Sequence, residues 1–431
     1  MKKGLKYLLI FFLITNFAYG QKTKKKTGAK AEIFDGKVVN IKVLNETQST
    51  ILDLSDTDFS DLESIKKLKG RYQLNLSGTP VKDFTPLKYL DNYLELDLSK
   101  TGFADTKNLE RLRNLSKVDL SETKITLVEG LGKLKALTVV YLDKTQITDI
   151  SDLKNLNILS SLSLNETKVK DIQVVKTSNK LEELYINKTN VIDLSPISQS
   201  LYLRTLDAGN TAIFDIEGLK AVINLQELNL KNSFVADITH LKNLRRLRKV
   251  DLAGTQINDI SSLITHTEMQ ELDLAGTFVS DVSALRKMRI LKTLNLSGTK
   301  VADAAPLAYL KTLEELDLSK TKVTNIDALQ RMTNLKKLNL SGLKLQDIRA
   351  VKYLENLTEI DLSSTGIKDL KDLDKLKNLK TVRLADNGLT DSQIEEFKKL
   401  KASYKVVLEA PKEKEKAEKK PQSGSIFKKR K

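Results

Sequence analysis

The chain has 431 residues and a formal net charge of +16, with 72 lysines and arginines against 56 aspartates and glutamates. It contains no cysteine and two histidines, which excludes disulfides, thiolate metal sites and a cysteine nucleophile. The positive charge is concentrated at the two ends and leaves about +2 on the residues between them. The basic composition therefore does not indicate that the folded part binds nucleic acid.

The first 20 residues have the pattern of a secretory signal peptide. A start with three lysines precedes an apolar run over residues 7–17 and the small-residue cleavage site Ala18-Tyr19-Gly20. The run is far shorter than the roughly 20 residues that span a bilayer. We therefore expect an exported protein that begins at Gln21 and has no transmembrane span. The absence of cysteine and the abundance of lysine favour a bacterial source.

Residues 21–50 are expected to form a basic arm and then an irregular first strand over about 31–50, which covers the N-terminal edge of the part that follows. Val38, Val39, Ile41 and Val43 supply the apolar residues of this strand. The segment would act as an N-terminal cap.

A sequence motif of 22 residues then repeats sixteen times between Leu52 and Leu389, without insertion or deletion. In its Leu-x-Leu stretch, alternation sends both leucines inward and the residues beside them outward. One repeat cannot bury its apolar face alone, so neighbouring repeats must stack. The pattern predicts an α/β solenoid over residues 51–391, a leucine-rich repeat horseshoe. Sixteen short parallel strands would line its concave face, with 3₁₀ or short helical turns on its convex face.

Two polar positions recur after each predicted strand. Threonine occupies the turn in 13 of the 16 copies, and Ser233, Leu343 and Asn387 replace it in the others. We expect its buried hydroxyl to bond the backbone of the adjacent turn. Four residues later, 14 copies have aspartate, which is typical of an N-cap before a helical turn.

These residues carry a resemblance to a known family. The phrases at 145–150 (Thr-Gln-Ile-Thr-Asp-Ile) and 255–260 (Thr-Gln-Ile-Asn-Asp-Ile), inside an unbroken 22-residue period, resemble the bacterial internalin-type leucine-rich repeats. The resemblance covers about four-fifths of the chain and departs from the family in having threonine where asparagine is usual. It implies that a surface or secreted protein recognises a macromolecule, and it implies no particular receptor.

The C-terminal end is expected to close the solenoid over residues 392–410. Ser392 and Glu395 have the spacing of a capping box that opens a helix to about residue 401, and 404–408 supply a last strand. Residues 411–431 form a lysine-rich tail that we expect to be disordered. The tail is either a solvated end or a tether to anionic envelope polymers.

Residues 22 apart become neighbours in such a stack, so each outward position forms a lane across the concave face, with strands about 4.8 Å apart. Two lanes alternate lysine and glutamate, which we interpret as stabilisation of the sheet. The lane between the two leucines, called the central lane below, holds eight aspartates and no lysine. Its adjacent pair Asp251 and Asp273 is a secondary binding candidate within an acidic strip for a basic or hydroxyl-rich partner. Calcium binding and repeat drift without function are the alternatives.

The central lane changes in three consecutive repeats, where Tyr141, Ser163 and Tyr185 replace Asp or Asn. Two residues farther on, Asp143, Asn165 and Asn187 replace the usual serine. Exposed aromatic rings beside hydrogen-bonding groups favour recognition hot spots. These six residues are the first candidate for a binding patch, although good strand propensity also explains the tyrosines.

Phe234 and Phe278 are a second candidate, because other repeats place lysine at their position after the turn. They could also pack against lysine stems.

An enzyme is not expected. His240 and His266 fall on convex segments, and the carboxylates lie on an open sheet with no inserted loop that would form a pocket. The sequence has no pattern for a metal or cofactor. We expect an exported bacterial recognition scaffold, at the periplasm, outer surface or medium, that binds a protein or glycan on its concave face. The alternative is an envelope-organising protein held by its basic tails.

Overall fold

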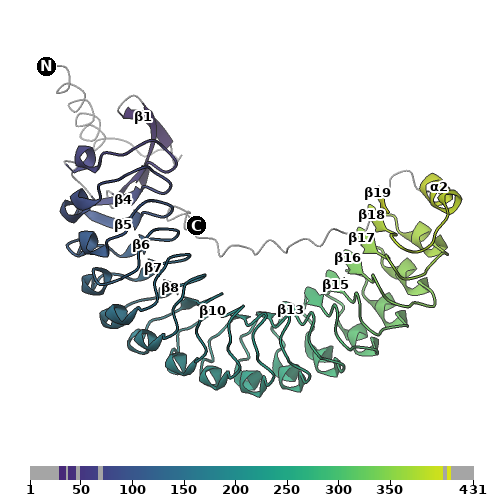
Figure 1. Ribbon diagram of the computed structural model, residues 1–431. Coiled ribbons are helices and arrows are strands. Elements are labelled where there is room, and N and C mark those ends of the chain that lie inside the picture. Colours follow the sequence, from purple (N-terminus) through teal and green to yellow (C-terminus); the bar gives the residue numbers. More distant parts are fainter. Residues whose placement is uncertain (1–28, 35–36, 45–48, 67–70, 401–404, 409–431) are drawn as a thin grey trace, which may run out of the picture.

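The computed structural model describes residues 29–34, 37–44, 49–66, 71–400 and 405–408, which form an open arc (Figure 1). Short strands line the inner, concave side of the arc, and helical turns lie along its outer, convex side. One hydrophobic core, built mainly from the leucines of the repeat, runs between these two layers. The expected signal peptide (1–20) and basic tail (411–431) lie outside the described residues, as does most of the basic arm.

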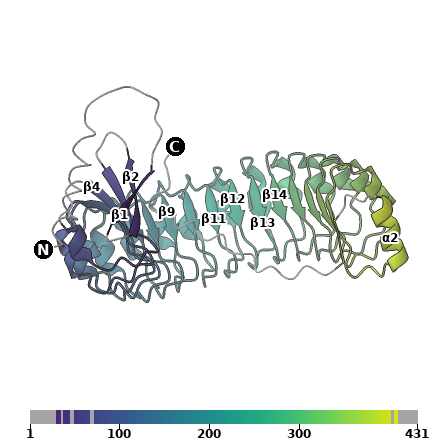
Figure 2. The ribbon, with the colours of Figure 1, turned by 90° about the horizontal axis from the view of Figure 1, so that it is seen from above.

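The concave face is a parallel sheet that follows the order of the chain, as the view from above shows (Figure 2). Its strands are β3 (Ser49–Asp53), β4 (Arg71–Asn75), β5 (Tyr93–Asp97), β6 (Lys117–Asp119), β7 (Val139–Tyr141), β8 (Ser161–Ser163), β9 (Glu183–Tyr185), β10 (Thr205–Asp207), β11 (Glu227–Asn229), β12 (Lys249–Asp251), β13 (Glu271–Asp273), β14 (Thr293–Asn295), β15 (Glu315–Asp317), β16 (Lys337–Asn339), β17 (Glu359–Asp361), β18 (Thr381–Arg383) and β19 (Lys405–Val407).

The strand register confirms the predicted horseshoe. From β3 to β18 the central leucine positions pair with residues 22 farther along, as in Leu206 with Leu228 and Val250 with Leu272. These sixteen strands are the sixteen predicted ones, and β19 adds one more at the C-terminal edge. The lanes inferred from the repeat are therefore real rows of neighbouring side chains.

Short 3₁₀ helices form the convex side, as the dozen residues between strands required. They are η1 (Leu62–Ile65), η2 (Thr85–Tyr89), η3 (Thr106–Leu109), η4 (Leu131–Lys133), η5 (Ser151–Asn155), η6 (Gln173–Thr177), η7 (Ser195–Ile197), η8 (Glu217–Leu219), η9 (Thr239–Asn243), η10 (Ser261–Thr265), η11 (Ser283–Lys287), η12 (Ala305–Tyr309), η13 (Asp327–Arg331), η14 (Arg349–Tyr353) and η15 (Lys371–Lys375).

The repeated aspartate closes a hydrogen-bonded turn at the start of these helices, and it is the N-cap residue itself at Asp61 and Asp105. In thirteen copies its carboxylate accepts a hydrogen bond from the backbone N–H two residues later, for example at 2.8 Å between Asp149 and Ser151. Asn325 makes the same contact in its repeat. The exception is Leu127, which cannot accept this bond.

The turn threonines bond within their own turn, so the predicted bond to the adjacent turn was wrong. All thirteen donate their hydroxyl to the carbonyl three residues earlier, at 2.6–2.7 Å. The hydroxyl and the carbonyl lie in one tight turn, where the side chain reaches its own backbone first. Asn387, in the last repeat, does link repeats, because its side chain contacts the backbone of both Leu362 and Thr365.

Replacing the buried Thr145 with valine is expected to destabilise the fold by about 1 kcal/mol. Valine keeps the shape of the side chain but removes the 2.7 Å bond to the Leu142 carbonyl. Chemical denaturation followed by circular dichroism would measure the change. Thr148→Val is the control, because Thr148 is exposed in the same repeat. Equal unfolding midpoints for the two variants would show that the turn bond does not stabilise the repeat.

Two elements cover the N-terminal edge, where a single irregular strand was expected. Strand β1 (Ala29–Phe34) pairs antiparallel with β2 (Lys37–Leu44), and β2 pairs antiparallel with β3. The apolar alternation identified β2, while β1 is too polar at Lys30 and Glu32 to stand out in the sequence.

At the other end, helix α2 (Asp391–Leu400) follows the last repeat. Its capping box is formed by Thr390 and Gln393, so the predicted box at Ser392 and Glu395 was wrong. The Gln393 side chain accepts from the Thr390 N–H at 2.9 Å, and the Thr390 hydroxyl accepts from the Gln393 N–H at 3.3 Å. Strand β19 then pairs with β18.

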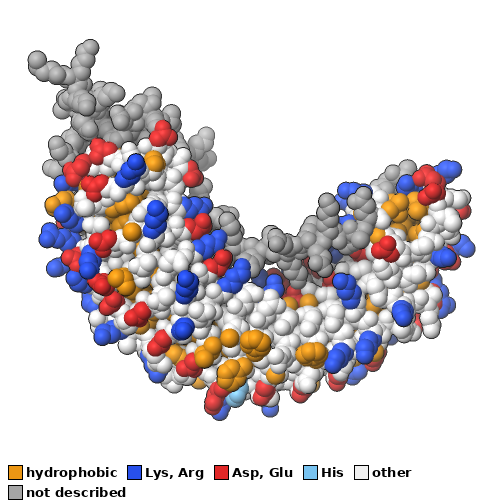
Figure 3. All heavy atoms as spheres, viewed as in Figure 1, with side chains coloured by type: hydrophobic (Ala, Val, Ile, Leu, Met, Phe, Trp, Pro, Cys, Tyr) orange, Lys and Arg blue, Asp and Glu red, His pale blue; other side chains and the backbone are white. Residues whose placement is uncertain are grey.

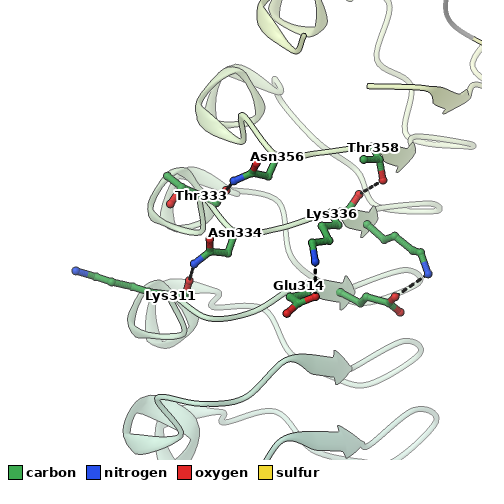
Figure 4. A network of polar contacts seen from close by, with 9 residues as sticks. Lys311, Glu314, Thr333, Asn334, Lys336, Asn356 and Thr358 are labelled. Atoms are coloured by element: carbon green, nitrogen blue, oxygen red, sulfur yellow. Dashed lines mark hydrogen bonds and ion pairs between the residues drawn. The ribbon is translucent and has the colours of Figure 1, made fainter. Parts of the chain in front are cut away.

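Side chains in the segments between each 3₁₀ helix and the next strand also join neighbouring repeats. Asn334 donates to the carbonyl of Lys311, and Asn356 donates to that of Thr333, at 2.8 and 2.9 Å (Figure 4). Beside them, Lys336 pairs with Glu314 at 2.6 Å. These contacts add to the sheet ladder in fixing the spacing between repeats.

Candidate functional site

The central lane has a structural role that the sequence did not reveal. In all twelve copies with aspartate or asparagine, the side-chain oxygen accepts a hydrogen bond from the backbone N–H two residues later. Asp and Asn share this acceptor and lysine lacks it, which explains the composition of the lane. The preference for Asp and Asn in the lane therefore has a structural cause.

Four repeats lack this acceptor, with Tyr141, Ser163, Tyr185 and Arg383 in the central lane, and the turns of two of them use another one. The Asp143 carboxylate accepts from the Asn165 N–H, and the Asn165 side chain accepts from the Asn187 N–H, both at 2.8 Å. Each side chain belongs to the repeat before the amide that it caps. The two changes seen in the sequence are thus one exchange of capping mode, which we call the cap exchange. It leaves the central lane free for Tyr141, Ser163 and Tyr185.

The structure brings these six candidate residues together. Tyr141, Ser163 and Tyr185 are direct neighbours on β7, β8 and β9. The two tyrosines are half-buried, and Ser163 between them is 2% exposed, with its hydroxyl donated to Asp143. Asp143, Asn165 and Asn187 lie beside them but are held by the cap exchange.

Burial and nearby carboxylates keep the tyrosines protonated. Burial raises the pKa of Tyr141, and Glu183, Asp119 and Asp143 raise it further, against a hydrogen bond to Ser161 that lowers it. Burial also raises the pKa of Tyr185, together with Glu183 and Tyr141. The phenols are therefore neutral at physiological pH and lie in a field of negative charge.

The two pairs of adjacent aspartates in the central lane have different surroundings. Burial and the neighbouring Asp119 raise the pKa of Asp97 to about 6, against hydrogen bonds from Ser99 and the charge of Lys117. Asp251 and Asp273 are half-buried neighbours on β12 and β13, and each caps its own turn. Asn295 also donates to Asp273 at 3.0 Å. In the part of the chain that the structure describes, no group of three or more acidic or histidine side chains could hold a metal ion.

The two alternating lanes form ion pairs between strands, as expected from sheet stabilisation. Lys249 pairs with Glu271 at 3.2 Å, and Lys337 pairs with Glu315 at 2.6 Å. Lys144 and Glu122 approach to 3.9 Å in the other lane. An open hollow of about 280 Å³ over β11–β13, which the sequence did not indicate, is lined by polar members of these rows: Gln226, Glu227, Arg248, Lys249, Gln270 and Glu271.

The second candidate lies on a flank of the arc, away from the concave face. Phe234 and Phe278 are 56% and 48% exposed, and Ile192 and Phe214 are exposed two residues farther along equivalent segments. Hydrophobic side chains gather near the middle of the arc (Figure 3). The Lys300 ammonium lies 4.7 Å from the ring centroid of Phe278, within the range of a cation–π contact.

The histidines show no arrangement for chemistry. His266 is fully buried in the core, and its ring nitrogens lie 3.2 and 3.1 Å from the carbonyls of Leu263 and Leu241. Burial lowers its pKa. His240 lies on η9 of the convex side. Neither residue shares a site with the carboxylates of the central lane.

Comparisons with known proteins agree with this architecture. A family model described as leucine-rich repeats (2 copies) matches residues 113–155, 311–353 and 355–401. No curated protein sequence matches the chain. Among the described residues, no helix is long and apolar enough to cross a bilayer.

Solved structures with the same fold include bacterial and plant proteins. An internalin (InlF) of Listeria monocytogenes is 27% identical, with a TM-score of 0.64, over 71% of this chain and 90% of that one. A leucine-rich repeat protein of Leptospira interrogans is 20% identical, with a TM-score of 0.68, over 81% and 98%. The functional domain of InlJ from Listeria monocytogenes is 18% identical, with a TM-score of 0.68, over 78% and 73%.

Proposed function

This chain is a leucine-rich repeat protein with internalin-like 22-residue repeats, and from that premise we propose that it binds a protein partner on its concave face. Proteins with such repeats are interaction scaffolds. The binding site in the proposal is the patch formed by Tyr141, Ser163 and Tyr185 with their neighbours. The protein would be exported from a bacterium and would catalyse no reaction.

The observation that best supports this patch is the distribution of charge. Between β5 and β18, only β7 and β8 have no charged residue at the positions two before, one before and one after the central leucine. Six uncharged residues result, namely Thr138, Val139, Tyr141, Ser160, Ser161 and Ser163. Interface cores are depleted in charge and enriched in tyrosine, so this area has the composition of a contact surface.

The patch is also held rigid. Thr138 and Ser160 each donate their hydroxyl to a carbonyl of the preceding repeat at 3.0 Å, and Ser161 donates to Glu183 at 2.9 Å. These polar groups are thus hydrogen-bonded before a partner binds, and the tyrosines lie beside side chains that are held in place. A preorganised surface loses little entropy when it binds.

A protein that works as a scaffold fits the other observations. The carboxylates of the central lane cap turns, and His266 is a core residue, which leaves no set of groups arranged for catalysis among the described residues. Export is supported by the signal-peptide pattern of residues 1–20.

The double variant Tyr141→Ala, Tyr185→Ala is expected to lose the partner and keep its fold. Wild-type chain from Gln21 would be used to capture binding proteins from bacterial envelope and host extracts. The control is Tyr202→Ala, Tyr309→Ala, which removes two exposed tyrosines outside the concave face. All three proteins should have the same melting curve. A partner that the double variant at 141 and 185 still captures would exclude this patch.

Because the chain has no cysteine, the contact can also be located directly. A photoactivatable cross-linker on Val139→Cys lies within the patch, and the same group on Thr381→Cys lies on β18 near the C-terminal end. We expect the partner to be cross-linked from position 139 and not from 381. Cross-linking from 381 alone would place the partner elsewhere on the concave face.

A further inference from the structure

The two tyrosines of the patch are surrounded by carboxylates. Asp119 is the direct neighbour of Tyr141 on β6, and Asp207 is the direct neighbour of Tyr185 on β10. Asp143 follows Tyr141 by two residues, and Glu183 precedes Tyr185 by two, on the same face of their strands. Electrostatic repulsion from Glu183 acts on both phenols. Four acidic groups therefore border two aromatic rings.

The structure already has one cation beside these rings. The Lys117 ammonium lies 5.6 Å from the centroid of the Tyr141 ring, within the range of a cation–π contact. Lys117 also lowers the pKa of Asp97 and Asp119, so it lies close to both carboxylates. The four bordering carboxylates outnumber this ammonium, which favours a further cation beside the rings.

The spacing of the rings leaves room for a flat group. Strands β7 and β9 are two strand spacings apart, or about 10 Å. Ser163 on β8 between them is small and buried, so it does not fill the space above it. Side chains on a concave face converge toward their tips. A planar group with a ring on each side needs about 7–8 Å, at two van der Waals contacts of about 3.5–4.0 Å.

We propose that the space between Tyr141 and Tyr185 receives an arginine side chain of the protein partner. The proposal rests on the concave-face function above and names the chemistry of that site. A guanidinium group is planar and stacks on aromatic rings, and its N–H groups donate in its own plane to carboxylates. Rings above and below, with the Glu183 carboxylate beside them near β8, where Ser161 donates to it, match both requirements. A lysine ammonium has no plane to stack, and a neutral sugar can donate hydroxyls to the carboxylates but does not neutralise their charge.

The test uses N-acetyl-arginine amide as the probe and the mature chain with isotope-labelled tyrosine rings. Tyr141→Phe and Tyr185→Phe assign the two resonances among the 11 tyrosines. We expect the arginine probe to shift these two resonances in a saturable way and the isosteric citrulline probe to leave them unchanged. Glu183→Gln should weaken the effect by about fivefold. Glu315→Gln, at the equivalent position of β15, should not change it.

The outcomes separate this proposal from the proposed function. If the tyrosine-to-alanine variant loses its partner but arginine shifts neither resonance, the concave-face site stands and its preference for arginine is wrong. Equal shifts with citrulline, or shifts spread over all tyrosines, would also overturn the preference. A direct check is the captured partner itself, since changing its contacting arginines to glutamine should abolish binding to the wild-type chain.

Discussion

Replacing Asp97 with asparagine is expected to stabilise the folded protein at pH 7 by about 2 kcal/mol. Burial and Asp119 raise the pKa of Asp97 to about 6, so its ionised form is unfavourable in the folded state. Asparagine removes that charge and keeps the cap, because Asn75 in an earlier repeat accepts the equivalent bond from the Ser77 N–H at 3.0 Å. Thermal melts of both proteins would measure the gain.

The stability gained by the Asp97→Asn variant should depend on pH. Below the unfolded value of 3.8, Asp97 is protonated in both states, and parent and variant should be equally stable. The parent then loses stability relative to the variant as the pH rises from about 4 to 6, and the difference is constant above that. Asp317→Asn is the control, because the neighbours of Asp317 in the lane are Asn295 and Asn339. An equal gain in the control, or a gain already present at pH 3, would contradict the prediction.

Replacing Gly130 with alanine is expected to destabilise the protein by about 3 kcal/mol. A Cβ atom at this position would lie 1.9 Å from the Thr106 carbonyl oxygen and 2.4 Å from its carbon. These atoms belong to backbone of the preceding repeat, where a rotamer change cannot relieve the overlap. The repeats on either side of η4 must then move apart. Denaturant unfolding would measure the loss.

Gly102→Ala is the matched control for this change. A Cβ atom at Gly102 would lie 3.8 Å from the Val81 carbonyl oxygen, an ordinary contact. The control should unfold within about 1 kcal/mol of the parent. If the two alanine variants unfold together, the close approach at Gly130 relaxes without cost.

The repeat predicted the fold because strict length makes register a matter of arithmetic. Residues 22 apart had to pair, and Leu206 with Leu228 is one of many pairs that do. The residues of the capping box of α2 were harder to predict. Both Thr390 with Gln393 and Ser392 with Glu395 fit the spacing of a capping box. Only the position where the last turn ends selects the first pair, and a single sequence does not fix that end to within two residues.

The sequence identified which residues form the candidate site, but it did not reveal the hydrogen bonds that allow them to replace the usual Asp and Asn. The sequence showed that Tyr141, Ser163 and Tyr185 break the central lane together with Asp143, Asn165 and Asn187. It did not show why these residues change together, because the bond that the Asn187 N–H donates to the Asn165 side chain depends on how two successive turns face each other. The Asp and Asn caps could have been found, since one acceptor two residues before an amide recurs in twelve copies.

The cap exchange also changes how this part of the solenoid comes apart. In the twelve repeats with Asp or Asn in the central lane, a turn carries its own cap, so such a repeat can open without removing the cap of the next. The turns of Asn165 and Asn187 instead each depend on a side chain of the repeat before them. Opening the repeat of Tyr141 removes the cap of the second turn, and losing that turn removes the cap of the third. We therefore expect fraying that begins at the N-terminal end to open these three repeats together more often than three repeats that carry their own caps.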